Sequence, residues 1–233
     1  MPLYDNYHSF RPKPTALGKK MAIRAKAKFA NVIQKLAPEN RPKVLEIGPG
    51  KGLFALHCSS AFDYEAIEPN ESMAQALRDQ GISVTGGSVP GTPLPAAHFD
   101  AVYVDQVFEH LPSMNHQLEM LQEIHKTLTP NGLLALAAPE YESWREIFYV
   151  SDYTHQTPTS RISTLQMLYD TGFEIVKSGY CAWGIDGRFI SAAISGAVRV
   201  ADALGVTVLM GDAKRMKILS SLLRGFYVYA RKK

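Results

Sequence analysis

The feature that most constrains this chain is a glycine-rich segment that follows a short apolar run. The run at 44–47 leads into Gly48-Pro49-Gly50-Lys51-Gly52, and apolar sequence resumes at Leu53. Glycine reaches positive φ angles and lets a ligand approach the backbone without steric cost. The pattern therefore predicts a buried parallel strand, a tight loop and a helix start, an arrangement that binds ligands at the carboxyl end of a strand. It first indicates a nucleotide-like cofactor.

Size and composition suit a single α/β domain with a large core. The chain has 233 residues and is 46% hydrophobic, which is enough to bury a substantial core. Its 25 basic and 22 acidic residues give a net charge of +3, too balanced to indicate nucleic acid as a partner. Cys58 and Cys181 lie far apart and form no metal-binding pair. We therefore expect reduced thiols in a cytoplasmic protein without a metal site.

Two segments bear on secretion and membranes. The amino-terminal segment lacks the apolar core of a secretory signal, so we do not expect secretion. The apolar stretch 189–210 carries Arg199 and Asp202 near its middle. A spanning helix would place both charges in hydrocarbon, which argues against a transmembrane segment.

Strand-like and helix-like segments alternate along most of the chain. An amphipathic helix is predicted at 15–37. The strands predicted after it are 43–47, 64–67, 82–84, 99–104 and 133–138. Between them, one helix is predicted to begin at Gly52 and two others to span 72–80 and 118–128. Such alternation predicts a parallel sheet with right-handed crossovers and helices on both faces. The carboxyl third is less regular, with predicted helices at 163–171, 188–204 and 213–224 and strands at 173–177 and 226–230.

The glycine spacing separates this loop from the dinucleotide-binding motif. That motif has the form GxGxxG, whereas the third glycine here comes one position earlier. With Glu46 before the loop and Glu68 after the next strand, the pattern resembles the class I S-adenosylmethionine-dependent methyltransferases, whose first motif has the form E/D-x-G-x-G-x-G. The resemblance implies a doubly wound, Rossmann-like sheet of seven strands that is mostly parallel. Its antiparallel last strand lies between the fifth and sixth, and 226–230 suits that place.

The resemblance also implies S-adenosylmethionine as the cofactor and assigns residues to it. Glu68 stands where the family places an acid against the ribose, because one carboxylate accepts hydrogen bonds from both hydroxyls. Ser88 replaces the usual acid near the adenine; its hydroxyl still accepts a hydrogen bond, and backbone groups of Ser88 and Val89 carry more of the recognition. The cofactor-binding residues implied are Glu46, Gly48, Pro49, Gly50, Gly52, Glu68, Pro69, Met73, Ser88, Val89, Asp105 and Gln106.

Two further segments indicate the acceptor. The segment 105–111 resembles the part of the family that follows the fourth strand and adjoins the methionine portion and the acceptor. It lacks the N/D-P-P-Y/F tetrad of DNA and protein amide methylators, which argues against amide or exocyclic amine substrates. The segment 152–155 and the following helix and Gly172-Phe173 resemble, more weakly, small-molecule methyltransferases that include many from sugar and glycolipid biosynthesis. We therefore expect O-methylation of a small-molecule, sugar or glycolipid-type acceptor.

A hydroxyl acceptor has to lose its proton, and histidine suits that role near neutral pH. His110 and His155 lie on predicted loops at the ligand edge of the sheet and are the candidate catalytic bases. Each also has a structural interpretation: His110 orients the segment after the fourth strand, and His155 clamps a lid to the sheet. The alternative function is a cofactor-binding subunit that transfers no methyl group. A third function, that of a nicotinamide oxidoreductase, is disfavoured by the glycine spacing.

The expected organisation is an amino-terminal helical extension at 1–40 and a methyltransferase domain at 41–233. Within the domain, 140–160 and 185–225 are expected to be acceptor-side or lid insertions. An aromatic set near helical spacing fits a packed cover, a wall of the acceptor pocket, or both. It comprises Tyr141, Trp144, Phe148 and Tyr149.

Basic residues alternate with apolar ones at 213–224. They fit peripheral contact with an anionic membrane, although we favour the solvated face of a core or dimer helix. The sequence does not indicate an oligomeric state.

Overall fold

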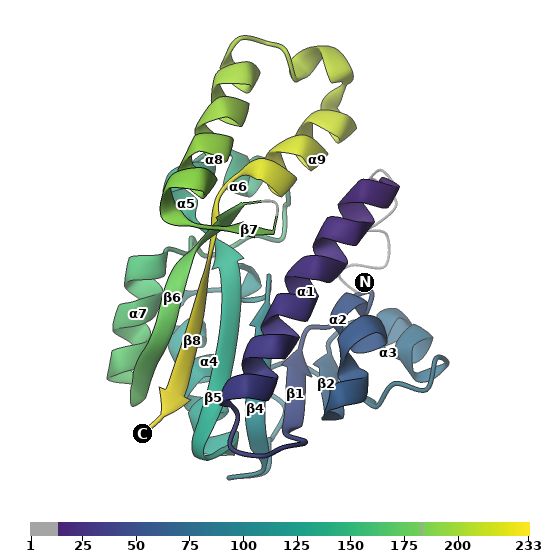
Figure 1. Cartoon of the computed structure of the whole chain (residues 1–233), viewed down its shortest axis with the longest axis vertical. Helices are drawn as coiled ribbons and strands as arrows, with labels where there is room; N and C mark the ends of the chain where they lie inside the picture. The colour runs from purple at the N-terminus through teal and green to yellow at the C-terminus, as the bar shows by residue number, and fades with distance from the viewer. Residues whose placement is uncertain (1–13, 183) are drawn as a thin grey trace.

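An eight-stranded sheet forms the centre of the computed structural model, which describes residues 14–182 and 184–233. The strands lie in the order β3-β2-β1-β4-β5-β8-β6-β7 (Figure 1). Their bounds are Lys43–Ile47 for β1, Asp63–Glu68 for β2, Val84–Gly86 for β3, Phe99–Asp105 for β4, Leu128–Pro139 for β5, Phe173–Ala182 for β6, Ile185–Asp186 for β7 and Gly225–Lys232 for β8. All seven expected strands are present, and the two-residue β7 is an addition at the edge. Residues 1–13 of the expected amino-terminal extension lie outside the described residues.

The pairing of the strands confirms the expected topology. β1 is parallel to β2 and β4, and β4 is parallel to β5. β8 is antiparallel to both of its neighbours, β5 and β6, so the last strand is inserted between the fifth and the sixth. The third strand begins two residues later than expected, because Gly81 has a φ of +80° and the Ile82 amide donates to the Leu77 carbonyl, which extends the end of the preceding helix.

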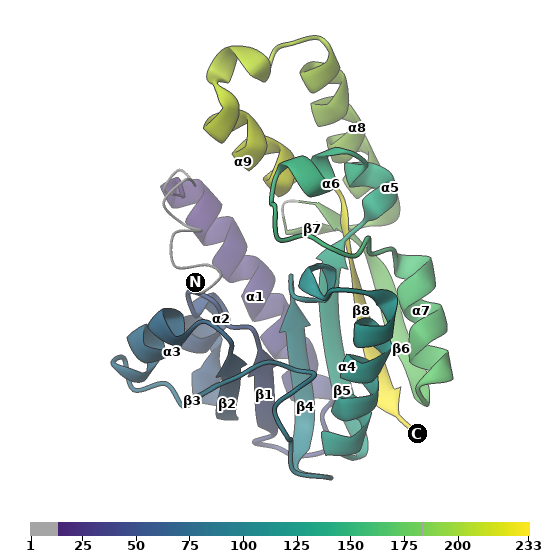
Figure 2. The same ribbon diagram turned by 180° about the vertical axis from the view of Figure 1, so that it is seen from behind.

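Helices cover both faces of the sheet. On one face, α1 and α2 pack over a core that includes Phe54 and Tyr103, and on the other α4 and α7 pack over a core that includes Phe108 and Phe173 (Figures 1 and 2). A further helix, α3, packs at the β3 end of the sheet. The bounds of these helices are Ala16–Leu36 for α1, Leu53–Cys58 for α2, Glu71–Arg78 for α3, Met114–Thr127 for α4 and Arg161–Asp170 for α7. The layered α/β fold expected from the sequence is therefore confirmed.

The carboxyl third builds a separate helical layer above the carboxyl ends of the parallel strands (Figure 1). It consists of α5 (Tyr141–Trp144), α6 (Ile147–Val150), α8 (Arg188–Ala203) and α9 (Asp212–Leu222). Its core is formed by Trp144, Ile147, Phe148, Val198, Leu219 and Leu223. Trp144 and Phe148 are thus part of a packed cover rather than an open pocket wall.

Two findings bear on contact with membranes. Leu219 of α9 and the following Leu223 are buried in this helical core. This burial fits the interpretation of 213–224 as a core helix with a solvated basic face. The most exposed large apolar side chains of this layer lie elsewhere, at Phe189, Leu204 and Leu209. In the described part of the chain, no helix is both long enough and apolar enough to cross a bilayer.

Candidate functional site

The three loop glycines all adopt left-handed backbone, with φ of +70°, +55° and +70° at Gly48, Gly50 and Gly52. A Cβ atom on Gly48 would lie 2.6 Å from Cγ2 of Val107, and one on Gly52 would lie 2.3 Å from Cδ2 of Leu77. A Cβ atom on Gly50 would meet no atom within 4 Å. Close packing therefore requires two of the glycines, whereas the third faces open space.

That open space belongs to a cavity of about 540 Å³ at the carboxyl ends of β1, β2 and β4. The volume lies within the roughly 300–1,000 Å³ typical of ligand pockets, and its place is where open α/β sheets bind ligands. The cavity is lined by most of the residues that the sequence predicts for the cofactor, namely Gly48, Gly50, Glu68, Pro69, Met73, Ser88, Val89 and Gln106.

The remaining four predicted cofactor residues do not line this cavity. Pro49 and Gly52 shape the loop, since the Gly52 amide donates to the Pro49 carbonyl at 2.8 Å. Glu46 and Asp105 lie on the sheet face that α1 covers, because side chains alternate between faces along a strand. Their neighbours Ile47 and Val104 point to the opposite face.

Glu68 is a buried carboxylate at the end of β2, held by the backbone. Its Oε2 accepts from the Gly50 amide at 2.9 Å, and its Oε1 accepts from the Asn70 amide at 3.0 Å. Burial raises the pKa of Glu68, and these two hydrogen bonds offset part of the rise. Each oxygen of a carboxylate accepts more than one hydrogen bond. Glu68 is therefore suited to accept from two further hydroxyls.

The opposite wall of the cavity is built by the start of α3 and the loop after β3. Asn70 caps α3 by accepting from the Met73 amide at 2.9 Å, and Met73 lies on the cavity wall. The Ser88 hydroxyl donates to the Pro90 carbonyl at 3.1 Å. Its oxygen can also accept a hydrogen bond from an N–H donor.

A polar cluster lies between α1 and the sheet. The ammonium of Lys26 pairs with Asp105, and the Tyr103 hydroxyl donates to the same carboxylate at 2.6 Å. Glu46 accepts from the Tyr64 hydroxyl. Burial is the main cause that raises the pKa of Glu46 to about 7. The role of Lys26 was not predicted from the sequence, because its partner Asp105 lies 79 residues away and the basic residues of this helix suit a solvated face.

His110 and His155 come together, with ring centroids 4.9 Å apart. Only His110 lines the cavity. Its Nδ1 lies 2.9 Å from the Thr154 hydroxyl, which donates its own proton to Asp152 at 2.6 Å. Nδ1 of His110 therefore carries a proton and donates, which leaves Nε2 as the basic nitrogen of the neutral ring.

His155 sits beside His110 and packs against two aromatic side chains. It is 8% exposed, and its ring packs against Phe148 at 4.6 Å and Trp144 at 6.2 Å between centroids. Its Nδ1 donates to the Phe148 carbonyl at 2.6 Å. These contacts join the α5–α6 segment to His110, which follows β4.

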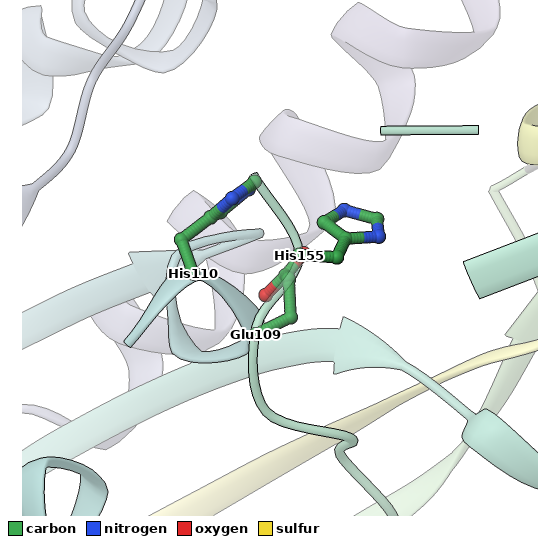
Figure 3. A group of neighbouring side chains, drawn as sticks. All are labelled: Glu109, His110 and His155. Atoms are coloured by element: carbon green, nitrogen blue, oxygen red, sulfur yellow. The ribbon is translucent and has the colours of Figure 1, made fainter. Parts of the chain in front are cut away.

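Glu109 completes this group and was not predicted from the sequence. Possible ligand atoms of Glu109, His110 and His155, the histidine–glutamate cluster, lie within 4.8 Å of one another (Figure 3). Glu109 is 0% exposed, and neither of its carboxylate oxygens has a hydrogen-bond partner among the described residues. Burial raises the pKa of Glu109 well above its ordinary value. The available sequence signal was its position directly before a candidate base.

A parallel sheet with a reversed strand between β5 and β6, and a glycine loop after β1, defines the class I methyltransferase fold. A family model described as "Methyltransferase domain" matches residues 21–178. This match spans more than half of the chain, so the chain belongs to the methyltransferase domain family and is an S-adenosylmethionine-dependent methyltransferase. Comparison with curated proteins gives no match.

Solved structures show the same fold. A SAM-dependent methyltransferase from Archaeoglobus fulgidus is 19% identical, with 97% of each chain covered and a TM-score of 0.64. A putative methyltransferase from Bacillus halodurans is 16% identical, with 88% of this chain and 99% of that chain covered and a TM-score of 0.63. A putative methyltransferase from Haloferax volcanii, solved with the Trm112 activator, is 14% identical, with 94% of this chain and 99% of that chain covered and a TM-score of 0.61. At these identities the similarity establishes the fold alone.

Proposed function

We propose that this methyltransferase acts on a hydroxyl group of a small-molecule, sugar or glycolipid-type acceptor. The observation that carries the proposal is His110, whose ring lines the cavity with Nε2 as its basic nitrogen. A hydroxyl acceptor needs such a proton acceptor near neutral pH. The family assignment favours an enzyme over the non-transferring subunit that the sequence left open.

In this proposal, the cavity holds the nucleoside part of S-adenosylmethionine. Gly50 offers backbone without a side chain, Glu68 accepts from the ribose hydroxyls, and Ser88 accepts from the adenine amino group. Two observations support the fit: the open space at Gly50 and the remaining acceptor capacity of the buried Glu68.

The polar cluster beneath α1 suits the amino-acid part of the same cofactor, which carries one ammonium and one carboxylate. Lys26 supplies a positive charge, and Asp105 and Glu46 supply carboxylates at the ends of β4 and β1. Charge-assisted hydrogen bonds are stronger than neutral ones, so this complementarity would add to affinity. Pro49 and Gly52 contribute by fixing the shape of the loop.

When bound, S-adenosylmethionine supplies a methyl carbon that its sulfonium charge has already activated. The main task of the chain is to hold the acceptor oxygen in line with that carbon, and such positioning supplies on the order of 7–11 kcal/mol. His110 takes the hydroxyl proton at Nε2, while Thr154 and Asp152 keep the ring oriented through Nδ1. His155 positions His110 rather than contacting the acceptor, since it does not line the cavity.

The acceptor would enter beside His110, where Leu111 and Pro112 add apolar wall. Pockets for small molecules combine such apolar walls with a few polar groups. In this proposal the segments 140–160 and 185–225 cover the acceptor side of the domain.

The test is methyl transfer from isotope-labelled S-adenosylmethionine to matched acceptors that carry either a hydroxyl or an amine on the same ring or sugar. We expect the hydroxyl member to be methylated, with one S-adenosylhomocysteine formed per product. His110→Asn should lower kcat by roughly 10²–10⁴-fold, the usual contribution of a general base, and retain cofactor affinity. Product identity is read by mass spectrometry.

His57→Asn is the matched control, because His57 is exposed on α2 and lies outside the cavity. It should retain the wild-type rate. Methylation of the amine member alone, or an unchanged kcat in His110→Asn, would contradict the proposal.

A further inference from the structure

The proposed function leaves Glu109 unexplained. A base at His110 does not require a second, fully buried carboxylate beside it. Burying a carboxylate without hydrogen bonds is costly unless it is neutralised or paired with a cation. The carboxylate oxygens of Glu109 have no hydrogen-bond partner among residues 14–182 and 184–233, yet this side chain lies in a group with two imidazoles. A cation held between this carboxylate and the two imidazoles would neutralise the buried charge.

The contacts of the two histidines fix which nitrogen faces a ligand. Nδ1 of His110 donates to Thr154, and Nδ1 of His155 donates to the Phe148 carbonyl. Both rings therefore present Nε2 as the lone-pair nitrogen. Metal-binding histidines are commonly oriented in this way, with the other ring nitrogen donating to a carbonyl or a polar side chain.

We propose that Glu109, His110 and His155 bind one divalent transition-metal cation of the zinc type. Two imidazoles and one carboxylate are a ligand set of catalytic zinc sites, which keep further positions open. Figure 3 shows the Glu109 side chain between the two rings. Ligands that share a zinc at about 2.0–2.2 Å lie at most roughly 4.4 Å apart. The possible ligand atoms of the cluster now lie within 4.8 Å of one another. Small side-chain rotations would bring them to the separation that a shared zinc requires.

The charge of the surroundings also fits a divalent cation. Asp152 is buried, and its Oδ2 lies 3.9 Å from Nε2 of His155. The two carboxylates of Glu109 and Asp152 would balance two positive charges, while the imidazoles remain neutral. Imidazole ligands suit zinc, copper, iron or nickel, whereas magnesium and manganese prefer oxygen ligands.

The place of the site suggests its use, and this part rests on the proposed function. His110 belongs both to the cluster and to the cavity wall, so a cation there could bind the acceptor oxygen. Coordination would lower the pKa of the acceptor hydroxyl, whose proton would pass to bulk water. The oxygen–methyl bond then forms as the sulfur–methyl bond breaks, which leaves neutral S-adenosylhomocysteine. In the metal-free protein, His110 itself takes the proton.

The experiment is calorimetric titration of the chelator-treated full chain with Zn²⁺, Mn²⁺ and Mg²⁺ in the absence of acceptor. We expect one Zn²⁺ per chain, with weaker binding of Mn²⁺ and much weaker binding of Mg²⁺. Glu109→Gln keeps the shape of the side chain and should weaken Zn²⁺ binding by at least about 100-fold, since even indirect changes around metal ligands cost roughly 10–100-fold. The absorption spectrum of bound Co²⁺ would report the ligand geometry.

His57→Asn controls for binding to an exposed histidine and should leave the titration unchanged. Retained S-adenosylhomocysteine affinity would show that Glu109→Gln is folded, and His155→Gln serves as a second variant if it is not. Absence of stoichiometric binding to the wild-type chain, or unchanged affinity in both cluster variants, would overturn the site. A bound cation together with methylation of amines only would leave the site standing and reject the proposed function.

Discussion

The three glycines of the loop look alike in the sequence but play different parts. Gly48 and Gly52 leave room for Val107 and Leu77, so their lack of a side chain serves packing. Gly50 faces the cavity, so its lack of a side chain serves the ligand. All three have positive φ, which costs another residue roughly 1–2 kcal/mol.

A matched pair of substitutions separates these parts. Gly50→Ala should destabilise the cofactor-free protein by about 1–2 kcal/mol, through backbone strain alone, but weaken S-adenosylhomocysteine binding at least about tenfold, because its methyl group enters the cavity. Gly52→Ala should destabilise it by about 2–5 kcal/mol, because a clash with Leu77 adds to the strain. Urea unfolding and calorimetry measure the two effects. Wild-type affinity in Gly50→Ala would show that the cofactor does not lie against this loop.

At the scale of elements, α1 contributes more than a cover for the sheet. Its apolar side packs on the sheet through residues such as Phe29 and Ile33, as the periodicity predicts. Lys26 departs from the expected solvated basic face, since its ammonium reaches Asp105 at the end of β4. The helix thereby brings a positive charge to the carboxyl edge of the sheet.

Replacement of this lysine tests the role of α1. Lys26→Met should weaken S-adenosylmethionine binding by about 10–100-fold, corresponding to the roughly 1.5–3 kcal/mol of a hydrogen bond to a charged group. Adenosine, which lacks the amino-acid part, should bind as before. Lys20→Met, at an exposed position of the same helix, is the control. Equal losses for both ligands would instead indicate a general disturbance of the cavity.

At the scale of the whole molecule, the buried Glu46 links stability to pH. Burial raises its pKa in the folded protein to about 7 from the ordinary 4.5. Between these values the folded state binds more protons than the unfolded state, so stability falls as pH rises. The loss is complete above about pH 7 and amounts to about 3 kcal/mol.

Glu46→Gln should remove this part of the pH dependence. We expect the variant to match the wild type near pH 4.5 and to exceed its free energy of unfolding by about 3 kcal/mol at pH 8. The other buried acids, such as Glu68 and Glu140, are present in both proteins. Their contributions therefore cancel when the free energies of unfolding of the variant and the wild type are subtracted. Urea unfolding at several pH values between 5 and 8 makes the measurement. If the difference in free energy of unfolding between the variant and the wild type stayed constant across this pH range, Glu46 would not titrate there.

The amino-acid pattern predicted the order of the elements, and the resemblance to class I methyltransferases added the reversed last strand and most of the cavity wall. These features are local: apolar periodicity sets each helix and strand, and the loop glycines with Glu68 stand at the ends of consecutive strands. Because the carboxyl ends of parallel strands meet at one edge, such residues come together without any knowledge of distant contacts.

Only the tertiary structure decided which side of the sheet each end residue serves and which distant residues meet. Strand alternation directs Glu46 and Asp105 toward α1, where Lys26 joins them. The segment after α6 brings His155 to Glu109 and His110, which lie 45 to 46 positions earlier in the chain. Contacts over such separations depend on how whole elements pack, and no local pattern in the sequence encodes that packing.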